Sequence, residues 1–331
     1  MSRPPAMRPA IPPVLPRAAP PPGLWRGTPP AIFPPILGLF ALGLGWRRAG
    51  AILESRFATG LGEAVLGAVT LLFLFALIAY GAKLLRRPAV AAEDLRVLPG
   101  RGGLAAAAVG IYALAAAIAP YGPGAAHGLI VAGLALHGLL LVLVVRVMLA
   151  GPPEGRVVTP IWHLMFVGFL VAALAAAQSG WAGLARGIFW AMVPLAAAIW
   201  AVSLWQIATR IPPAPLRPLL AIHVAPASLL ATIAAEAGIG IGPLFLALAA
   251  AVALALAVSV RWVTVAGFSP LWGSFTFPIG AFAGALVAQG WAVAGGLMLV
   301  AATLAIPAIA FRVMRMWADR SLGARTNAAV A

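Results

Sequence analysis

The chain has 331 residues, of which 63% are hydrophobic and only 9% are charged, and this composition excludes a water-soluble globular protein. The formal net charge is +15, but the 22 Lys and Arg residues lie in short loops and tails, which argues against a nucleic-acid partner. There is no Cys, so disulfides, thiolate metal sites and Cys nucleophiles are excluded.

A Pro-rich stretch comes first along the chain, and apolar segments follow it. Residues 1–27 contain nine prolines and no apolar core, which predicts a disordered cytoplasmic tail rather than a signal peptide. Residues 28–317 read as a transmembrane domain, and residues 318–331 as a cytoplasmic C-terminal tail. Spanning a bilayer takes roughly 20 apolar residues. Ten segments of about this length are expected at 28–46, 60–84, 102–120, 126–149, 159–178, 181–208, 217–237, 242–263, 271–289 and 291–316.

The distribution of basic residues predicts the orientation of these spans. Basic residues collect in cytoplasmic loops. With the N-terminus in the cytoplasm, 18 of the 22 Lys and Arg residues fall on that side, leaving Arg47, Arg48, Arg56 and Arg186 outside. Both termini are therefore expected in the cytoplasm.

The odd-numbered and even-numbered spans differ in the size of their side chains. The odd spans carry small residues, including Gly38, Gly45, Gly110 and Gly168, whereas the even spans contain bulky runs such as residues 139–143. Small faces suit helices buried in protein or lining a cavity, and Leu-rich helices suit lipid. We therefore expect an all-α polytopic membrane protein. Its ten helices would form five hairpins, with the odd helices in an inner ring round a central pore.

Prolines near the starts of odd spans are expected to kink these helices. The candidates are Pro35, Pro160, Pro226 and Pro278. A kink frees backbone carbonyls, whose partial charge is unfavourable for an anion. We therefore expect the prolines to shape the pore rather than to coordinate ions.

The ninth span carries the candidate gate. With helical spacing, Gly273, Phe277, Gly280 and Gly284 share one face. Phe277 is therefore the one large side chain on a face of glycines. Phe275, the competing candidate, falls on the neighbouring bulky face. Phe277 is therefore expected to project into the pore. The alternative is that the small face only lets another helix come close.

The polar candidates in the spans are few. Ser228 and Thr232, one turn apart on the small face of the seventh span, are the best hydroxyl donors for an anion. Their alternative role is to bond back to carbonyls of their own helix. Packing is the favoured role of His163 and His223, with gating as the alternative.

The remaining ionisable residues decide between function classes. His127 and His137 have no metal-ligand partner at helical spacing, so no metal or cofactor is expected. Glu63 and Glu236 lie near the outer ends of their spans, where they are marginal candidates for proton coupling. An enzyme site would need a cluster of polar catalytic residues at mid-depth, and the spans contain none, so the chain is not expected to be an enzyme.

From about residue 28 to 316, the chain resembles the TehA-type tellurite-resistance and C4-dicarboxylate transporter family, which includes the plant guard-cell slow anion channel. Besides the ten-span layout, three stretches carry the resemblance: residues 159–168, residues 215–226, and Trp272 to Pro278. The last is the most specific. The first departs from the family pattern at His163 and Met165.

The resemblance implies a selective anion channel in a bacterial-type inner (plasma) membrane, typically a homotrimer with a pore in each protomer. A Phe on the ninth span occludes that pore, and its motif position corresponds to Phe277. We therefore expect gated passage of small inorganic or organic anions. The alternative is a proton-coupled transporter or exporter of dicarboxylate, sulfite or tellurium oxyanions. Neither the anion nor the stimulus that opens the pore follows from the sequence.

Overall fold

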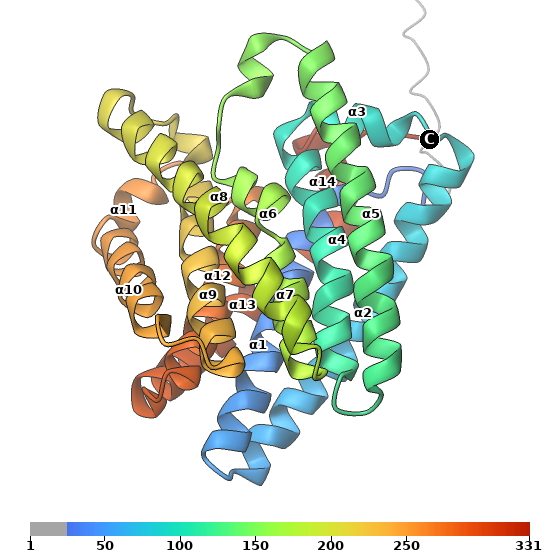
Figure 1. Ribbon diagram of the computed structural model, residues 1–331. Helices are drawn as coiled ribbons and strands as arrows, with labels where there is room; N and C mark the ends of the chain where they lie inside the picture. Colours follow the sequence, from blue (N-terminus) through green and yellow to red (C-terminus); the bar gives the residue numbers. More distant parts are fainter. Residues whose placement is uncertain (1–24) are drawn as a thin grey trace, which may run out of the picture.

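The computed structural model describes residues 25–331, and this part of the chain is helical without strands (Figure 1). Most of the Pro-rich tail expected at residues 1–27 lies outside the described residues. In chain order the elements are η1 (Pro30–Ile32), α1 (Phe33–Ile52), α2 (Arg56–Arg86), α3 (Val90–Arg96), α4 (Leu98–Ile118), α5 (Pro123–Ala150), η2 (Pro153–Arg156), α6 (Ile161–Phe166), α7 (Phe169–Gln178), α8 (Ala182–Thr209), η3 (Ala214–His223), α9 (Val224–Ala237), α10 (Gly242–Val258), α11 (Val260–Val263), η4 (Pro270–Trp272), α12 (Gly273–Ala288), α13 (Ala292–Ala318) and α14 (Ser321–Arg325).

Eight helices of the described chain are long and apolar enough to cross a bilayer. They are η1 with α1, α2, α4, α5, α8, η3 with α9, η4 with α12, and α13. The other two expected spans, 159–178 and 242–263, are each divided into two shorter helices. The structure therefore supports a polytopic helical membrane protein with eight continuous candidate spans instead of the ten expected.

The expected span 159–178 divides at Val167 and Gly168, between α6 and α7. A Cβ on Gly168 would lie 2.6 Å from the Val109 side chain on α4, so only glycine permits this close approach. The preceding turn, at the end of α6, contains carbonyls that lack partners within the helix. His137 of α5 bonds one of them, with its Nε2 2.8 Å from the Met165 oxygen. No pattern in the sequence predicted this role for His137.

The second division falls at Ser259, between α10 and α11. Its hydroxyl donates a hydrogen bond to the carbonyl of Ala255 at 2.7 Å. A serine that bonds back to its own helix in this way competes with the backbone ladder and bends the helix. The short α11 follows and ends at Val263.

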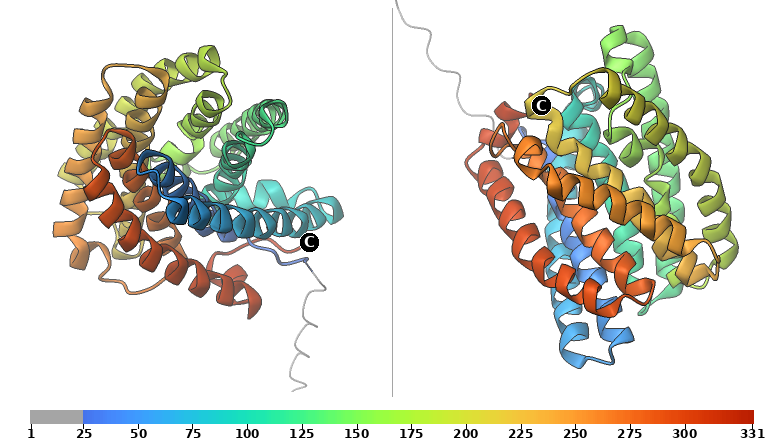
Figure 2. Two further views of the ribbon diagram at one scale, coloured as in Figure 1. Left: turned by 90° about the horizontal axis from the view of Figure 1, so that it is seen from below. Right: turned by 90° about the vertical axis from the view of Figure 1, so that its left-hand side faces the viewer.

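Helices that follow each other in the chain pack together in five pairs: α1 with α2, α4 with α5, α7 with α8, α9 with α10, and α12 with α13. The first members also contact one another, α1 meeting α4 and α12, and α9 meeting α7 and α12. Of the candidate spans, those of α1, α4, α9 and α12 are 56–89% buried, whereas α2, α5, α8 and α13 are only 22–33% buried. Seen end-on in Figure 2, the second members lie on the outside. Small residues are therefore buried and Leu-rich faces are exposed, as expected.

Glycine contacts explain how α1 and α12 come so close. Gly38 of α1 lies directly against Thr276 of α12. A Cβ on Gly280 of α12 would lie 2.8 Å from Cβ of Ala41 on α1. Helices with such faces gain close van der Waals contact along their whole length.

The segment 318–331, expected as a tail, contains α14 and then returns to α3 (Figure 1). The backbone N–H of Ala329 donates to the Asp94 carboxylate at 2.8 Å. Arg87 donates to the Val330 carbonyl at 2.7 Å. These bonds attach the end of the chain to the loop that follows α2.

Candidate functional site

A cavity of about 70 Å³ lies among the buried helices. Every residue that lines it comes from the five segments η1–α1, α4, α6–α7, η3–α9 and η4–α12. The lining is apolar except for Ser274 and His163. The Ser274 hydroxyl is within hydrogen-bonding distance of the carbonyls of Pro218 and Leu271, 2.7 Å from each, so it is already occupied. This space, called cavity 1 below, therefore offers little polar contact to a solute.

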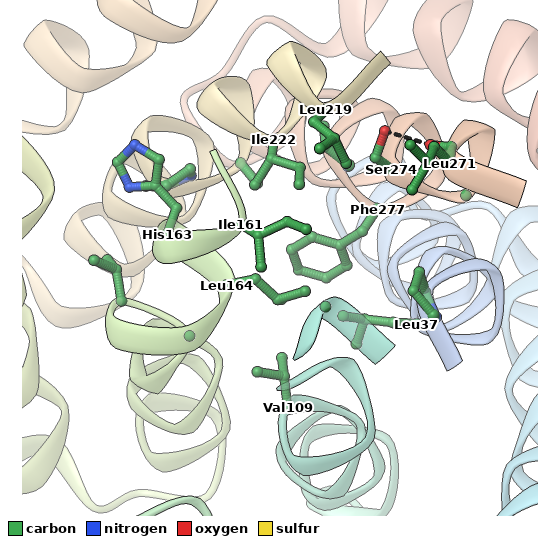
Figure 3. A pocket seen from close by; sticks show the side chains of 18 of the residues that line it. Leu37, Val109, Ile161, His163, Leu164, Leu219, Ile222, Leu271, Ser274 and Phe277 are labelled. Carbon is green, nitrogen blue, oxygen red and sulfur yellow. Dashed lines mark hydrogen bonds between the residues drawn. The ribbon is translucent and has the colours of Figure 1, made fainter. Parts of the chain in front are cut away.

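Phe277 projects into cavity 1 from α12. Figure 3 shows its ring in the middle of the lining, pointing toward Ile161 and Leu164. The same residue also lines a second, smaller cavity of about 30 Å³, called cavity 2. Phe275 lines neither cavity; its ring instead packs edge-on against Trp272, with centroids 5.6 Å apart. Of the two candidate rings, only Phe277 lines both cavities.

Cavity 2 is lined by the same group of helices and shares Val171, Leu229 and Phe277 with cavity 1. α1, α4, α7, α9 and α12 all contribute to it. Its polar lining residues are Thr232 and Arg48. Arg48 lies near the C-terminal end of α1, one turn beyond Gly45, which also lines this cavity.

The glycines expected to line a pore divide into two groups. Gly168 and Gly273 line cavity 1, and Gly45, Gly280 and Gly284 line cavity 2. Gly38 and Gly110 line neither: Gly38 lies against Thr276 and Gly110 against the ring of Phe73 on α2. For these two, absence of a side chain serves helix packing.

The two hydroxyl candidates on α9 both bond to their own helix. Ser228 donates to the Val224 carbonyl and Thr232 to the Ser228 carbonyl, each at 2.9 Å. Thr232 lines cavity 2, whereas Ser228 is fully buried and lines neither cavity. Because each hydroxyl has one hydrogen, neither is free to donate to an anion in this conformation.

The four prolines occupy different helical positions. Pro35 lies in the first turn of α1, Pro160 immediately precedes α6, and Pro226 lies in the first turn of α9. Proline is well tolerated in the first turn of an α-helix, where its fixed φ suits the helix. Pro278, next to Phe277, is the one of the four inside an α-helix.

His163 and His223 form a pair that sequence reasoning treated as two separate packing residues. Their rings meet edge-on with centroids 5.0 Å apart, and none of the four ring nitrogens has a hydrogen-bond partner among the described residues. His163 lines cavity 1. No periodicity links positions 163 and 223, because they meet only when η3 packs against α6.

Two ion pairs stand at the end of α1. Arg47 holds Glu63 of α2 through two bonds, at 2.6 and 2.7 Å. Arg48 is paired with Glu236 of α9. All four residues were expected near span ends. No sequence pattern predicted their pairing, because Arg48 and Glu236 are 188 positions apart.

A comparison with protein families now bears on this arrangement. The family model described as SLAC1, voltage-dependent anion channel, matches residues 27–316. The chain belongs to this family. Membership confirms the resemblance identified from the sequence and implies anion channel or transporter activity in a membrane. The SLAC1 family consists of channels and transporters rather than enzymes. No curated protein matches the chain.

Proposed function

We propose that the chain is a gated anion channel whose passage runs from cavity 1 to cavity 2 and is closed by Phe277. One observation carries this proposal: a single aromatic side chain lines both cavities. In this reading α1, α4, α6–α7, η3–α9 and η4–α12 form an inner ring round the passage, because they supply all of its lining residues.

The chemistry of the lining favours anions over cations. No carboxylate lines either cavity among the described residues, whereas Arg48 lines cavity 2. A cation in this passage would meet no acidic partner. An anion would meet one guanidinium after a neutral, apolar stretch. Selectivity in channels depends on such groups at close range.

The proposed gate is hydrophobic. Phe277 is half-buried and faces apolar neighbours, among them Leu37, Val109 and Leu164. A constriction lined this way excludes water, and an ion without its water shell does not cross it. Rotation of the Phe277 side chain toward cavity 2, bounded on that side by Gly280 and Gly284, would open the constriction.

The proton-coupled transporter has weaker support. It requires ionisable carboxylates that are free to bind and release protons within the membrane. Glu63 and Glu236, its two candidates, are each held by an arginine. Saturable flux that follows a pH gradient and disappears in Glu63→Gln or Glu236→Gln would favour it over the channel.

We also propose that the protein is a homotrimer, as the resemblance implies. The outward helices expose large apolar side chains, including Leu71, Trp190 and Leu204, which suit contact with lipid or neighbouring protomers. Light scattering of the detergent-solubilised protein measures the number of protomers. A monomeric mass would contradict the trimer but leave the pore proposal untouched.

The deciding experiment is a current measurement with ion substitution. The purified protein and its Phe277→Ala variant are reconstituted in planar bilayers with unequal KCl concentrations. We expect currents whose reversal potential lies near the chloride equilibrium potential, and larger currents in the variant. Phe275→Ala is the matched control, since its ring lines neither cavity. An increase in Phe275→Ala but not in Phe277→Ala would assign the gate to the other ring.

A further inference from the structure

Arg48 is the only Lys, Arg, Asp or Glu among the described residues that line cavities 1 and 2. Its side chain is 12% exposed, so it lies largely inside the protein rather than in bulk solvent. It stands opposite Gly284 of α12, where a Cβ would be 3.4 Å from its Nη1 atom. Gly284 thus leaves space beside the guanidinium, on the side of cavity 2.

The hydrogen bonds of Arg48 differ from those of its neighbour Arg47. Arg47 donates from Nε and Nη2 to Glu63 and from Nη1 to the carbonyls of Ala116 and Ala117. Arg48 donates from Nη2 to Glu236 and has no other hydrogen-bonded acceptor among the described residues. Its Nε and Nη1 atoms have no acceptor there, and neither atom is fully buried. These N–H groups therefore keep some accessible surface, on a residue that lines cavity 2.

The counter-ion of Arg48 is itself shared. Glu236 also accepts a bond from Gln178 of α7 at 3.2 Å. Arg186 of α8 donates to the carbonyl of the next residue, Ala237, at 2.9 Å. Two guanidinium groups therefore stand at this end of α9 with one carboxylate. This end of α9, next to the cavity 2 residue Arg48, therefore has an excess of positive charge, which attracts small anions.

We propose that Arg48 is the anion-binding and selectivity-determining residue of the passage, with Glu236 as the counter-ion that positions it. The proposal rests on the channel function above. It adds that the Arg48 guanidinium replaces part of the water shell that a small monovalent anion loses in the passage. Glu236 uses one edge of the guanidinium, and the free N–H groups face the permeating ion. Charge-assisted bonds from a guanidinium are stronger than those from neutral donors such as Thr232.

The test uses the full-length protein carrying Phe277→Ala, so that the passage conducts. Chloride-to-potassium permeability ratios are obtained from reversal potentials in unequal KCl. We expect Arg48→Gln to lower this ratio roughly fivefold or more, and Arg48→Lys to retain a larger part of it. Glu236→Gln should raise the chloride conductance, because the competing carboxylate is removed.

Two controls separate this effect from a general loss of surface charge. Arg47→Gln removes the adjacent arginine, which lines neither cavity, and Arg56→Gln removes an exposed arginine at the same end. Both should keep the parental permeability ratio. Elution of each variant as a single peak in size-exclusion chromatography shows that it is folded. If Arg48→Gln does not fold, Arg48→Lys and Glu236→Gln still carry the test.

Failure of this inference is distinguishable from failure of the channel proposal. Chloride-selective current that is equally selective in Arg48→Gln and Arg48→Lys, and unchanged in Glu236→Gln, would overturn the role of Arg48 alone. Absence of anion current from the Phe277→Ala parent would overturn both.

Discussion

Lys83 of α2 and Asp94 of α3 form an ion pair that is fully buried, with 2.8 Å between Nζ and Oδ2. Asp94 also accepts bonds from the Tyr80 hydroxyl at 3.0 Å and the Ala329 N–H at 2.8 Å. Lys83 also donates to the Thr28 carbonyl at 3.1 Å. The pair thus joins the first described residues, α2, α3 and the end of the chain.

This pair predicts a large asymmetry between single and double substitutions. Lys83→Met leaves the Asp94 carboxylate buried without its counter-ion, which should cost about 3–5 kcal/mol of unfolding free energy. Thermal unfolding in detergent measures the loss. Lys83→Met combined with Asp94→Leu should recover much of it, because no uncompensated charge remains.

The control for this prediction is the pair Arg87–Glu93, whose side chains are 42% and 36% exposed. Glu93→Gln should change the unfolding free energy by less than about 1 kcal/mol, because water screens an exposed pair. Equal losses of unfolding free energy in Lys83→Met and Glu93→Gln would contradict the prediction that the buried pair matters more than the exposed one.

Conductance should depend on the size of the side chain at position 277. Phe277→Leu and Phe277→Val should give intermediate increases, and Phe277→Ala the largest, roughly tenfold or more, because each step removes part of the hydrophobic constriction. Single-channel recording measures the series. Conductance that does not follow side-chain volume would contradict a steric gate at this residue.

Gly38 should be essential for the contact between α1 and α12. Gly38→Val forces a side chain into Thr276, and overpacking of this kind costs about 1–3 kcal/mol. Gly128 on α5, where a Cβ would meet nothing within 4 Å, provides the matched control. Gly128→Ala should keep or slightly raise the unfolding temperature, since alanine is the better helix former. Similar losses at both positions would refute close packing at Gly38.

Removing one member of the His163–His223 pair should stabilise the protein. Neither ring has a hydrogen-bond partner among the described residues, and a buried polar group without one costs about 1–3 kcal/mol. His223→Leu, which also keeps the cavity 1 residue His163 in place, should therefore raise the unfolding temperature. A clear decrease would show that the imidazoles form bonds through ordered water.

Ser228→Ala should leave anion conductance unchanged. The Ser228 hydroxyl is fully buried, donates to the Val224 carbonyl and lines neither cavity. Current measurements in the Phe277→Ala protein provide the test. A reduced chloride conductance would show that this hydroxyl turns toward the passage when the gate is open.

The sequence by itself determined the class of protein, its family and the difference between small-residue helices and Leu-rich helices. Length and hydropathy identify membrane helices because a bilayer demands long apolar segments. Helical spacing put Phe277 among glycines and Phe275 among bulky residues, and their surroundings in the structure differ accordingly. Such local patterns are readable because a helix fixes which residues share a face.

Only the tertiary structure decided which neighbour each face meets. Gly38 and Gly45 are equally small, yet one packs on Thr276 and the other lines cavity 2. The pairing of Arg48 with Glu236 and of His163 with His223 joins residues that no local period relates. Periodicity defines a face within one helix, whereas contacts between distant segments depend on how all the helices pack together.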